Sequence, residues 1–182
     1  LGIPYLVTHL GSHLGKGRET GLKQLIEAVD VAFGSSKGNT MLLLENTAGT
    51  KNSMGSSFED IREILDPVAK ESRVAVCFDT CHAFAAGYDM RDTESLGKTI
   101  AELEQIVGLG RVKAVHANDS KGDLGSRLDR HEHIGLGHIG EEGFKAILHH
   151  DTLRRLPFIL ETPIDRRRTD VMNLRKLREL AS

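Results

Sequence analysis

Four short apolar segments of this sequence each run directly into an acidic residue or a histidine. Residues 74–78 read VAVCF and are followed by Asp79, with His82 three positions further on. The other segments are residues 42–44 before Glu45, 112–115 before His116 and 158–160 before Glu161. A carboxylate or imidazole placed where a strand stops suits metal binding or acid–base chemistry. A single such end is usually an ordinary polar turn, but four repeats of the design favour one shared site.

Between these strands, apolar residues recur at helical spacing and predict a helix after each strand. Strands are expected at residues 4–8, 41–45, 73–79, 111–116 and 157–161, with helices near 19–33, 58–68, 93–107, 144–148 and 169–180. The strands are apolar along their length, and the alternation predicts a parallel sheet or a (β/α) barrel. Residues 11–15 do not fit the GxGxxG fingerprint that an open doubly wound sheet favours after its first strand.

Candidate ligands at the C-terminal ends of several strands favour a TIM-type barrel, because the chemistry of that fold sits on this face. The 182 residues supply five βα units, whereas a complete barrel has eight. We therefore expect an α/β fold in one domain over residues 1–182: a partial TIM barrel of five parallel βα units, without the first three. The two open edges of such an arc invite self-association.

Two connections stand out. Residues 80–91 are expected to form a loop that carries His82. Residues 117–140 lack periodicity, and loops longer than about 12–15 residues in a compact domain are usually functional or disordered. Because this segment contains Asp129 and His131, we expect it to be functional.

Strand alternation places Glu45, Asp79, His116 and Glu161 on one side of the sheet, together at the mouth of the barrel. Three carboxylates packed together would repel each other, so a divalent cation is the simplest occupant. In an extended loop Asp129 and His131 project the same way and could share a second ion, with His82 as a third ligand. His13 could serve another ion beside Glu45. We expect His133, His138, His149 and His150 to be structural or solvated, and Arg166, Arg167 and Arg168 to form a solvated helix start, with phosphate binding as a weaker interpretation.

The charge and cysteine content narrow the class of protein. A formal net charge of −2 gives no indication of a general polyanion-binding surface, and no apolar run is long enough to span a membrane. Cys77 and Cys81 do not form a CxxC pair, so no disulfide framework is expected and a reducing compartment is the default.

In six segments the chain resembles the endonuclease IV family. They are HLGSH at 9–13, LENTAG at 44–49, FDTCHAFAAGYD at 78–89, HANDSK at 116–121, SRLDRH at 126–131 and LET at 160–162. That family comprises zinc-dependent apurinic/apyrimidinic endonucleases on a TIM barrel. The resemblance covers essentially the whole chain and implies hydrolysis of the phosphodiester 5′ to an abasic site.

The resemblance also implies a ligand set of three zinc ions. His13 and Glu45 belong to the first, together with a histidine from an earlier strand. Glu45, Asp79, His116 and Glu161 hold the second, and His82, Asp129 and His131 hold the third. Glu45 bridges two ions, Glu161 orients the attacking hydroxide, and Arg130 contacts a phosphate. The implied partner is double-stranded DNA with abasic sites or blocked 3′ ends, bound by a protein that is monomeric when complete.

Two other interpretations stay open. A sugar isomerase or epimerase on a similar barrel would need the four strand-end ligands and one divalent ion, but neither the third cluster nor His13. The chain could also be an inactive fragment or binding module, in which case the ligands would have no catalytic role. The number of bound metal ions separates the first of these from the nuclease.

Overall fold

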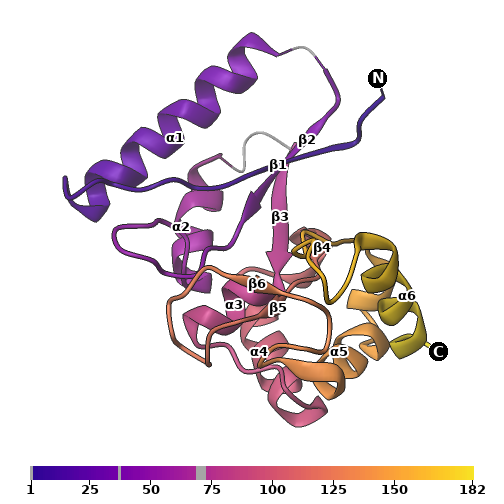
Figure 1. Cartoon of the computed structure of the whole chain (residues 1–182). Helices are drawn as coiled ribbons and strands as arrows, with labels where there is room; N and C mark the ends of the chain where they lie inside the picture. The colour runs from indigo at the N-terminus through magenta and orange to yellow at the C-terminus, as the bar shows by residue number, and fades with distance from the viewer. Residues whose placement is uncertain (1, 37, 69–72) are drawn as a thin grey trace.

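The computed structural model describes residues 2–36, 38–68 and 73–182. Five parallel strands form one sheet in the order β1-β2-β3-β4-β7 (Figure 1). They are β1 (Tyr5–Thr8), β2 (Met41–Glu45), β3 (Val74–Asp79), β4 (Val112–His116) and β7 (Phe158–Ile159). The partial barrel of five parallel strands is therefore confirmed.

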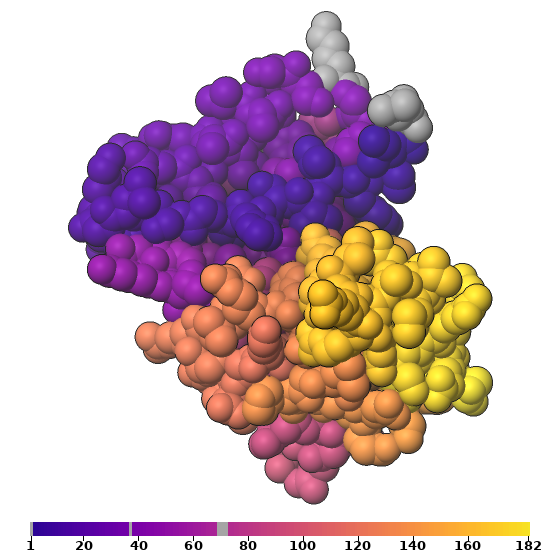
Figure 2. Space-filling model, in the orientation of Figure 1, coloured from indigo at the N-terminus to yellow at the C-terminus, as the bar shows by residue number. Residues whose placement is uncertain are grey.

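A helix follows each strand. The helices are α1 (Arg18–Ser35), α2 (Phe58–Val68), α3 (Thr80–Ala86), α4 (Thr93–Ile106), α5 (Gly140–His149) and α6 (Asp170–Leu180). Contacts run in chain order from α1 to α2, α4, α5 and α6, so these helices form one curved outer layer. The chain progresses around the arc, with its N-terminal part on one side of the molecule and its C-terminal part on the other (Figure 2). None of the helices in the described ranges is long and apolar enough to cross a membrane.

The sheet separates two apolar clusters. The larger one fills the space between the strands and the helices, and the smaller one on the other face consists of Leu43, Ala75, Cys77 and Ala114. Since side chains alternate along a strand, the residues two positions after Leu43, Cys77 and Ala114 lie on this second, inner face. These residues are Glu45, Asp79 and His116, so strand alternation delivers them to one side as expected.

The expected loop at residues 80–91 is wrong over its first half, which forms helix α3. The Asp79 side chain caps this helix by accepting a hydrogen bond from the backbone N–H of His82, and Gly87 ends it with a φ of 117°. The sequence concealed the helix because its residues are buried on every side, which leaves no amphipathic stripe to detect.

Two further expectations need correction near the C-terminus. Strand β7 has two residues rather than five, because it pairs with β4 alone and only over Val115 and His116. In α6 only half of the apolar residues at helical spacing face the core: Leu177 and Leu180 are buried, whereas Val171 and Leu174 are exposed.

The long segment at 117–140 is organised by one buried carboxylate, Asp119. It accepts hydrogen bonds from the backbone N–H groups of Ser120, Gly135, Gly137 and Ile139 at 2.8 to 3.0 Å. The segment also forms a small antiparallel ladder between β5 (Asp119–Ser120) and β6 (His131–Glu132). These bonds fix the stretch that carries Asp129 and His131 over the ends of the strands.

Candidate metal centre

The expected quartet of Glu45, Asp79, His116 and Glu161 comes together where β2, β3, β4 and β7 end. One potential ligand atom of each residue lies within 4.8 Å of all the others. His116 Nδ1 lies 3.1 Å from Glu45 Oε1 and 3.0 Å from Glu161 Oε2. Three of the four side chains are almost completely buried, whereas that of Glu161 is 44% exposed and opens the site to solvent.

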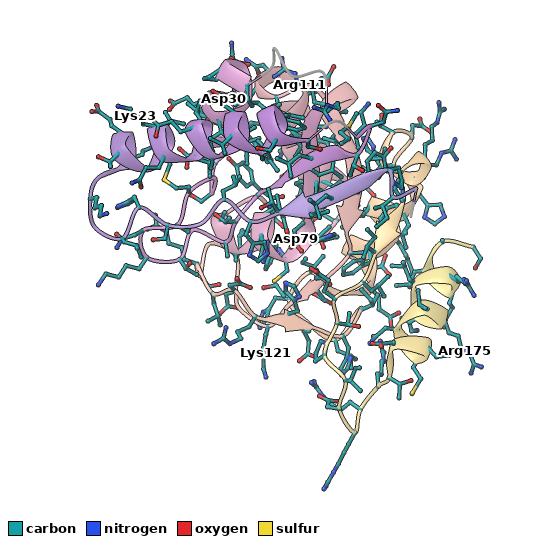
Figure 3. All side chains as sticks on the ribbon, turned by 90° about the horizontal axis from the view of Figure 1, so that it is seen from above. Lys23, Asp30, Asp79, Arg111, Lys121 and Arg175 are labelled. Carbon is teal, nitrogen blue, oxygen red and sulfur yellow. The ribbon has the colours of Figure 1, made fainter. Side chains whose placement is uncertain are left out.

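A second group consists of His82, Asp129 and His131, as the sequence also predicted. His82 Nε2 lies 3.2 Å from Asp129 Oδ1 and 3.5 Å from His131 Nε2. His82 comes from the first turn of α3, and the other two come from the segment organised by Asp119. Figure 3 shows Asp79 in the middle of the molecule, between the strand ends and these loops.

The ring orientations in this triad favour a cation. His82 Nδ1 lies 3.0 Å from the Asn46 carbonyl oxygen, and His131 Nδ1 lies 3.0 Å from that of Glu161. A carbonyl oxygen only accepts, so both Nδ1 atoms carry hydrogen and donate it. When such a ring is neutral, as a metal ligand must be, the lone pair of its Nε2 points toward the other ring and toward Asp129. Histidines that bind a metal through one ring nitrogen commonly donate the N–H of the other nitrogen to a carbonyl or carboxylate oxygen, which fixes the orientation of the ring.

The two groups are continuous with each other. His82 Nδ1 lies 3.3 Å from Glu45 Oε1, and His131 Nε2 lies 3.9 Å from Asp79 Oδ2. Seven potential ligands, of which only Glu161 is exposed, therefore line one polar centre at the C-terminal ends of the strands.

The buried carboxylates of the centre favour the binding of positive charge. Burial raises the pKa of Asp79. Burial acts in the same direction on Glu45, but hydrogen bonds with His116 and His82 outweigh it and lower the pKa of Glu45 to about 2. Burial lowers the pKa of His82, but its contacts with Asp129 and Glu45 raise it overall to about 11. Carboxylates that draw protons so strongly onto imidazoles are equally suited to a divalent cation.

Cys81 also lies within ligand distance of Asp79 and His131, and its Sγ lies 3.5 Å from the carbonyl oxygen of Arg130, to which the thiol donates. Burial raises the pKa of this thiol to about 12, whereas a thiol binds metal as the thiolate. Cys77 and Cys81 are both free and buried.

The structure places His9, and not His13, beside Glu45. His9 Nε2 lies 3.3 Å from Glu45 Oε2. Within the described ranges His13 has no carboxylate at ion-pair distance, and it lines a separate polar cavity of about 560 Å³ with Lys51 and Arg127. The expectation for His13 is therefore wrong in its geometry. The signal that identifies His9 was present in the sequence, because His9 follows Val7 on the inner face by the same strand alternation.

The loop after β1 explains where His13 goes. The backbone N–H of His13 donates to the carbonyl of Asn52, and that of Met54 donates to the carbonyl of Gly11. These bonds tie the loop to residues 52–54 of the next βα connection and carry His13 away from the strand ends.

The arginines that the sequence singled out differ in their exposure and in their partners. Arg130 is exposed, donates to the carbonyl of Asp129, and has no acidic partner among the described residues. Arg167 pairs with Glu132 and Asp165, so this part of the arginine run is a structural element rather than a solvated helix start, and α6 begins only at Asp170.

The histidines set aside as structural or solvated have ordinary environments. His133 is fully buried and contacts Asn173 and Asp165, whereas His138 is half exposed and pairs with Asp123. Neither ring contributes to the ligand groups.

The chain matches the model of the xylose isomerase-like TIM barrel family over residues 1–180. A protein of Methanoculleus marisnigri named "Probable endonuclease 4" is 55% identical over 182 residues, which is all of this chain and 64% of that protein. The crystal structure of endonuclease IV from Thermus thermophilus superposes with a TM-score of 0.82 at 37% identity, over 99% of this chain and 62% of that one.

A D-tagatose 3-epimerase-like protein shares the fold, with a TM-score of 0.62 at 21% identity over 97% of this chain and 61% of its own. The fold alone therefore does not separate a nuclease from a sugar-converting enzyme. The resemblance to endonuclease IV is confirmed by the relatives. The chain spans 64% of the length of the Methanoculleus relative and 62% of the Thermus structure.

Proposed function

The chain belongs to the xylose isomerase-like TIM barrel family, and we propose that it carries the metal centre of a DNA repair endonuclease of the endonuclease IV type. The reaction is hydrolysis of the phosphodiester 5′ to an abasic site in double-stranded DNA, or removal of a blocking group from a 3′ end. Residues 1–182 correspond in this proposal to one domain, the C-terminal portion of an endonuclease IV-like barrel.

One observation carries the proposal: the triad of His82, Asp129 and His131 lies directly beside the quartet of strand-end ligands. A single-metal isomerase would need the quartet alone. Two adjacent ligand groups suit phosphoester hydrolysis, in which charge develops on both the attacking and the leaving oxygen.

The donor set fits zinc, since imidazole nitrogens and carboxylate oxygens are ligands that zinc accepts in catalytic sites. The quartet would hold one ion and the triad another. His9 and Glu45 would contribute to a further site, in place of the His13–Glu45 pair expected from the sequence. When bound, zinc supplies charge that stabilises the transition state and a source of hydroxide near neutral pH.

The protein side chains then have distinct tasks. Glu161 has an exposed side chain at the edge of the quartet and orients the attacking water by accepting its hydrogen bond. Glu45 is buried between His9, His82 and His116 and shares its two oxygens among neighbouring groups. Arg130 lies next to the triad and contacts a substrate phosphate. A bond forms between phosphorus and the water oxygen, and the bond to the 3′ oxygen breaks. The water loses one proton and the leaving 3′ oxygen takes one up, so that the net products are a 5′-phosphate and a 3′-hydroxyl group.

An abasic nucleotide suits such a site for a physical reason. It has no base to unstack, so turning it out of the duplex costs less than for an intact nucleotide. Selection of the lesion would then follow from the flexibility of the abasic nucleotide as well as from its contacts with the protein.

The test combines metal content with incision. The chain would be stripped of metal, loaded with zinc and analysed by mass spectrometry, and then assayed on a duplex with one abasic site. The same assay would use the chain joined to the upstream part of the Methanoculleus relative. We expect about two or three zinc ions per chain and zinc-dependent incision by the joined form, leaving a 3′-hydroxyl. One ion per chain with ketose–aldose interconversion, or full zinc loading without incision by the joined form, would reject the proposal.

A further inference from the structure

Asn118 lies between two members of the quartet, Asp79 and Glu161, and touches both. It is fully buried and comes two residues after His116. Its Nδ2 donates to Asp79 Oδ2 at 2.7 Å and lies 3.4 Å from Glu161 Oε2. Its Oδ1 accepts from the backbone N–H of Glu161 at 2.8 Å. One carboxamide therefore connects a buried ligand with the one ligand of the quartet that is exposed.

We propose that Asn118 is a positioning residue for the quartet, which holds Asp79 and Glu161 at the separation that one cation requires. This inference rests on the proposed metal centre and assigns Asn118 no contact with the ion. Its amide is engaged on both sides by protein groups.

Glu161 depends on such a support because the sheet ends before it. Strand β7 stops at Ile159, and the backbone N–H of Ala117 donates to the carbonyl of Ile159 as the last sheet bond on this side. The Asn118 side chain then accepts a hydrogen bond from the next backbone N–H on this side, that of Glu161. It extends the ladder by one hydrogen bond, which fixes the direction in which the Glu161 side chain leaves the backbone.

Asn118 is itself held firmly. Thr80 Oγ1 accepts from the Asn118 backbone N–H at 3.0 Å and lies 2.7 Å from the Asn118 carbonyl oxygen, to which it donates. Thr80 is the first residue of α3 and follows Asp79 directly, so the backbone of Asn118 and that of Asp79 are joined by a fully buried hydroxyl.

The chemistry of the position explains why a carboxamide occupies it. A neutral amide donates to a carboxylate and accepts from an N–H at the same time. A lysine or arginine would neutralise the carboxylates and compete with the cation, and an aspartate would lack the donor. An apolar residue would leave the Asp79 oxygen and the Glu161 N–H without these partners, a loss that is costly in a buried site.

The test uses Asn118→Leu, which has nearly the same shape and no hydrogen-bonding group, and Asn118→Ala as a second variant. Asn173→Leu is the matched control. Asn173 is also a fully buried asparagine, but it contacts Thr162, His133 and Ile134, none of which belongs to the ligand groups. Zinc affinity at the two groups would be measured by calorimetric titration of the folded chain, with circular dichroism as a check of structure.

We expect both Asn118 variants to lose about 10–100-fold in zinc affinity at the quartet while the triad keeps its affinity. Asn173→Leu should lower the melting temperature and leave both affinities in place. Unchanged quartet affinity in a folded Asn118 variant would refute the inference. So would an equal loss at both groups, because that is the signature of general destabilisation. If Asn118→Leu does not fold, the Ala variant decides by the same criteria. If the unmodified chain binds no zinc, the proposed function fails first, and that outcome is distinct from the others.

Discussion

His9 Nε2 lies 3.3 Å from Glu45 Oε2, on the side of this carboxylate that faces away from His116. His116 and His82 both contact the other oxygen, Oε1. The two oxygens of Glu45 therefore face different imidazoles, as expected for a carboxylate that bridges two ions. The His9 side chain is largely exposed, whereas that of Glu45 is almost completely buried, so His9 lies on the solvent side of this carboxylate.

This relationship predicts that His9 contributes to zinc binding and that His13 does not. We expect His9→Gln to remove the weakest class of zinc sites in a calorimetric titration, because Glu45 alone would remain to hold that ion. His13→Gln is the control and should leave the titration unchanged. The opposite result would restore the interpretation drawn from the sequence.

Replacing Glu161 with Gln should keep the shape of the quartet and remove one of its charges. We expect incision of abasic DNA by the chain joined to the upstream part of a relative to fall by about 100-fold or more, with the fold preserved. Single-turnover incision assays measure this effect. Glu141→Gln, on a surface carboxylate that pairs with Lys176, should incise normally. Normal incision by the Glu161 variant at full zinc loading would remove this residue from the mechanism.

Arg130→Ala should weaken DNA binding while zinc remains bound, because the arginine side chain contacts the backbone carbonyl of Asp129 and not its carboxylate. The slope of log affinity against log salt should become shallower by about one unit, the value of one phosphate contact. Fluorescence anisotropy over a range of salt concentrations measures the slope. Arg154→Ala is the control, since Arg154 pairs with Asp151 on the surface. An unchanged slope would place Arg130 outside the DNA interface.

Tyr88 links α2 to the region that follows α3 and predicts an alkaline effect on stability. Its ring stacks on Phe58 with centroids 3.8 Å apart, and its hydroxyl accepts from the Phe58 backbone N–H at 2.9 Å. Burial raises the pKa of Tyr88 to about 12, from 10.0 in the unfolded chain. Between these values the unfolded chain releases the proton and the folded chain keeps it, so the free energy of unfolding falls as pH rises from about 10 to about 12.

At pH 8 the free energy of unfolding of Tyr88→Phe should therefore be about 0.5–1.5 kcal/mol lower than that of the unmodified chain, because the Phe58 N–H loses its acceptor. It should also lose less stability than the unmodified chain between pH 10 and 12. Urea unfolding at several pH values measures both effects. Parallel curves for the two proteins would exclude Tyr88 as the source of the alkaline loss.

The open edges of the sheet predict self-association of the 182-residue chain. Strands β1 and β7 each pair on one side, and Leu6 and Ile159 are 60% and 44% exposed. Unpaired edge strands with apolar side chains are templates for pairing with another chain. We expect concentration-dependent oligomers in light scattering, and Leu6→Lys should reduce them. Val31→Lys, at an equally exposed position on α1, should not. A monomer at all concentrations would contradict this expectation.

Where the sequence was misleading, the cause lay in contacts between distant segments. Helix α3 escaped detection because it is buried on all sides and capped by Asp79, itself a candidate ligand. The roles of Asn118 and Asp119 could not be predicted, because both lie in a segment without periodicity. Nothing in the local sequence distinguishes a polar side chain that binds distant backbone groups from one that faces water. His9 was passed over in favour of His13, although strand alternation from Val7 was sufficient to find it.

The five βα units, and the placement of Glu45, Asp79 and His116 on one face of the sheet, could be predicted from the amino-acid sequence alone. Both follow from periodicity, which acts over a few residues and is therefore visible in the chain alone. Two features could be found in the folded structure alone: His13 turns away from Glu45, and Asn118 connects Asp79 with Glu161. Those contacts depend on how loops after separate strands bend toward one another. Backbone hydrogen bonds between distant segments set these bends, as between His13 and Asn52, and no local pattern records them.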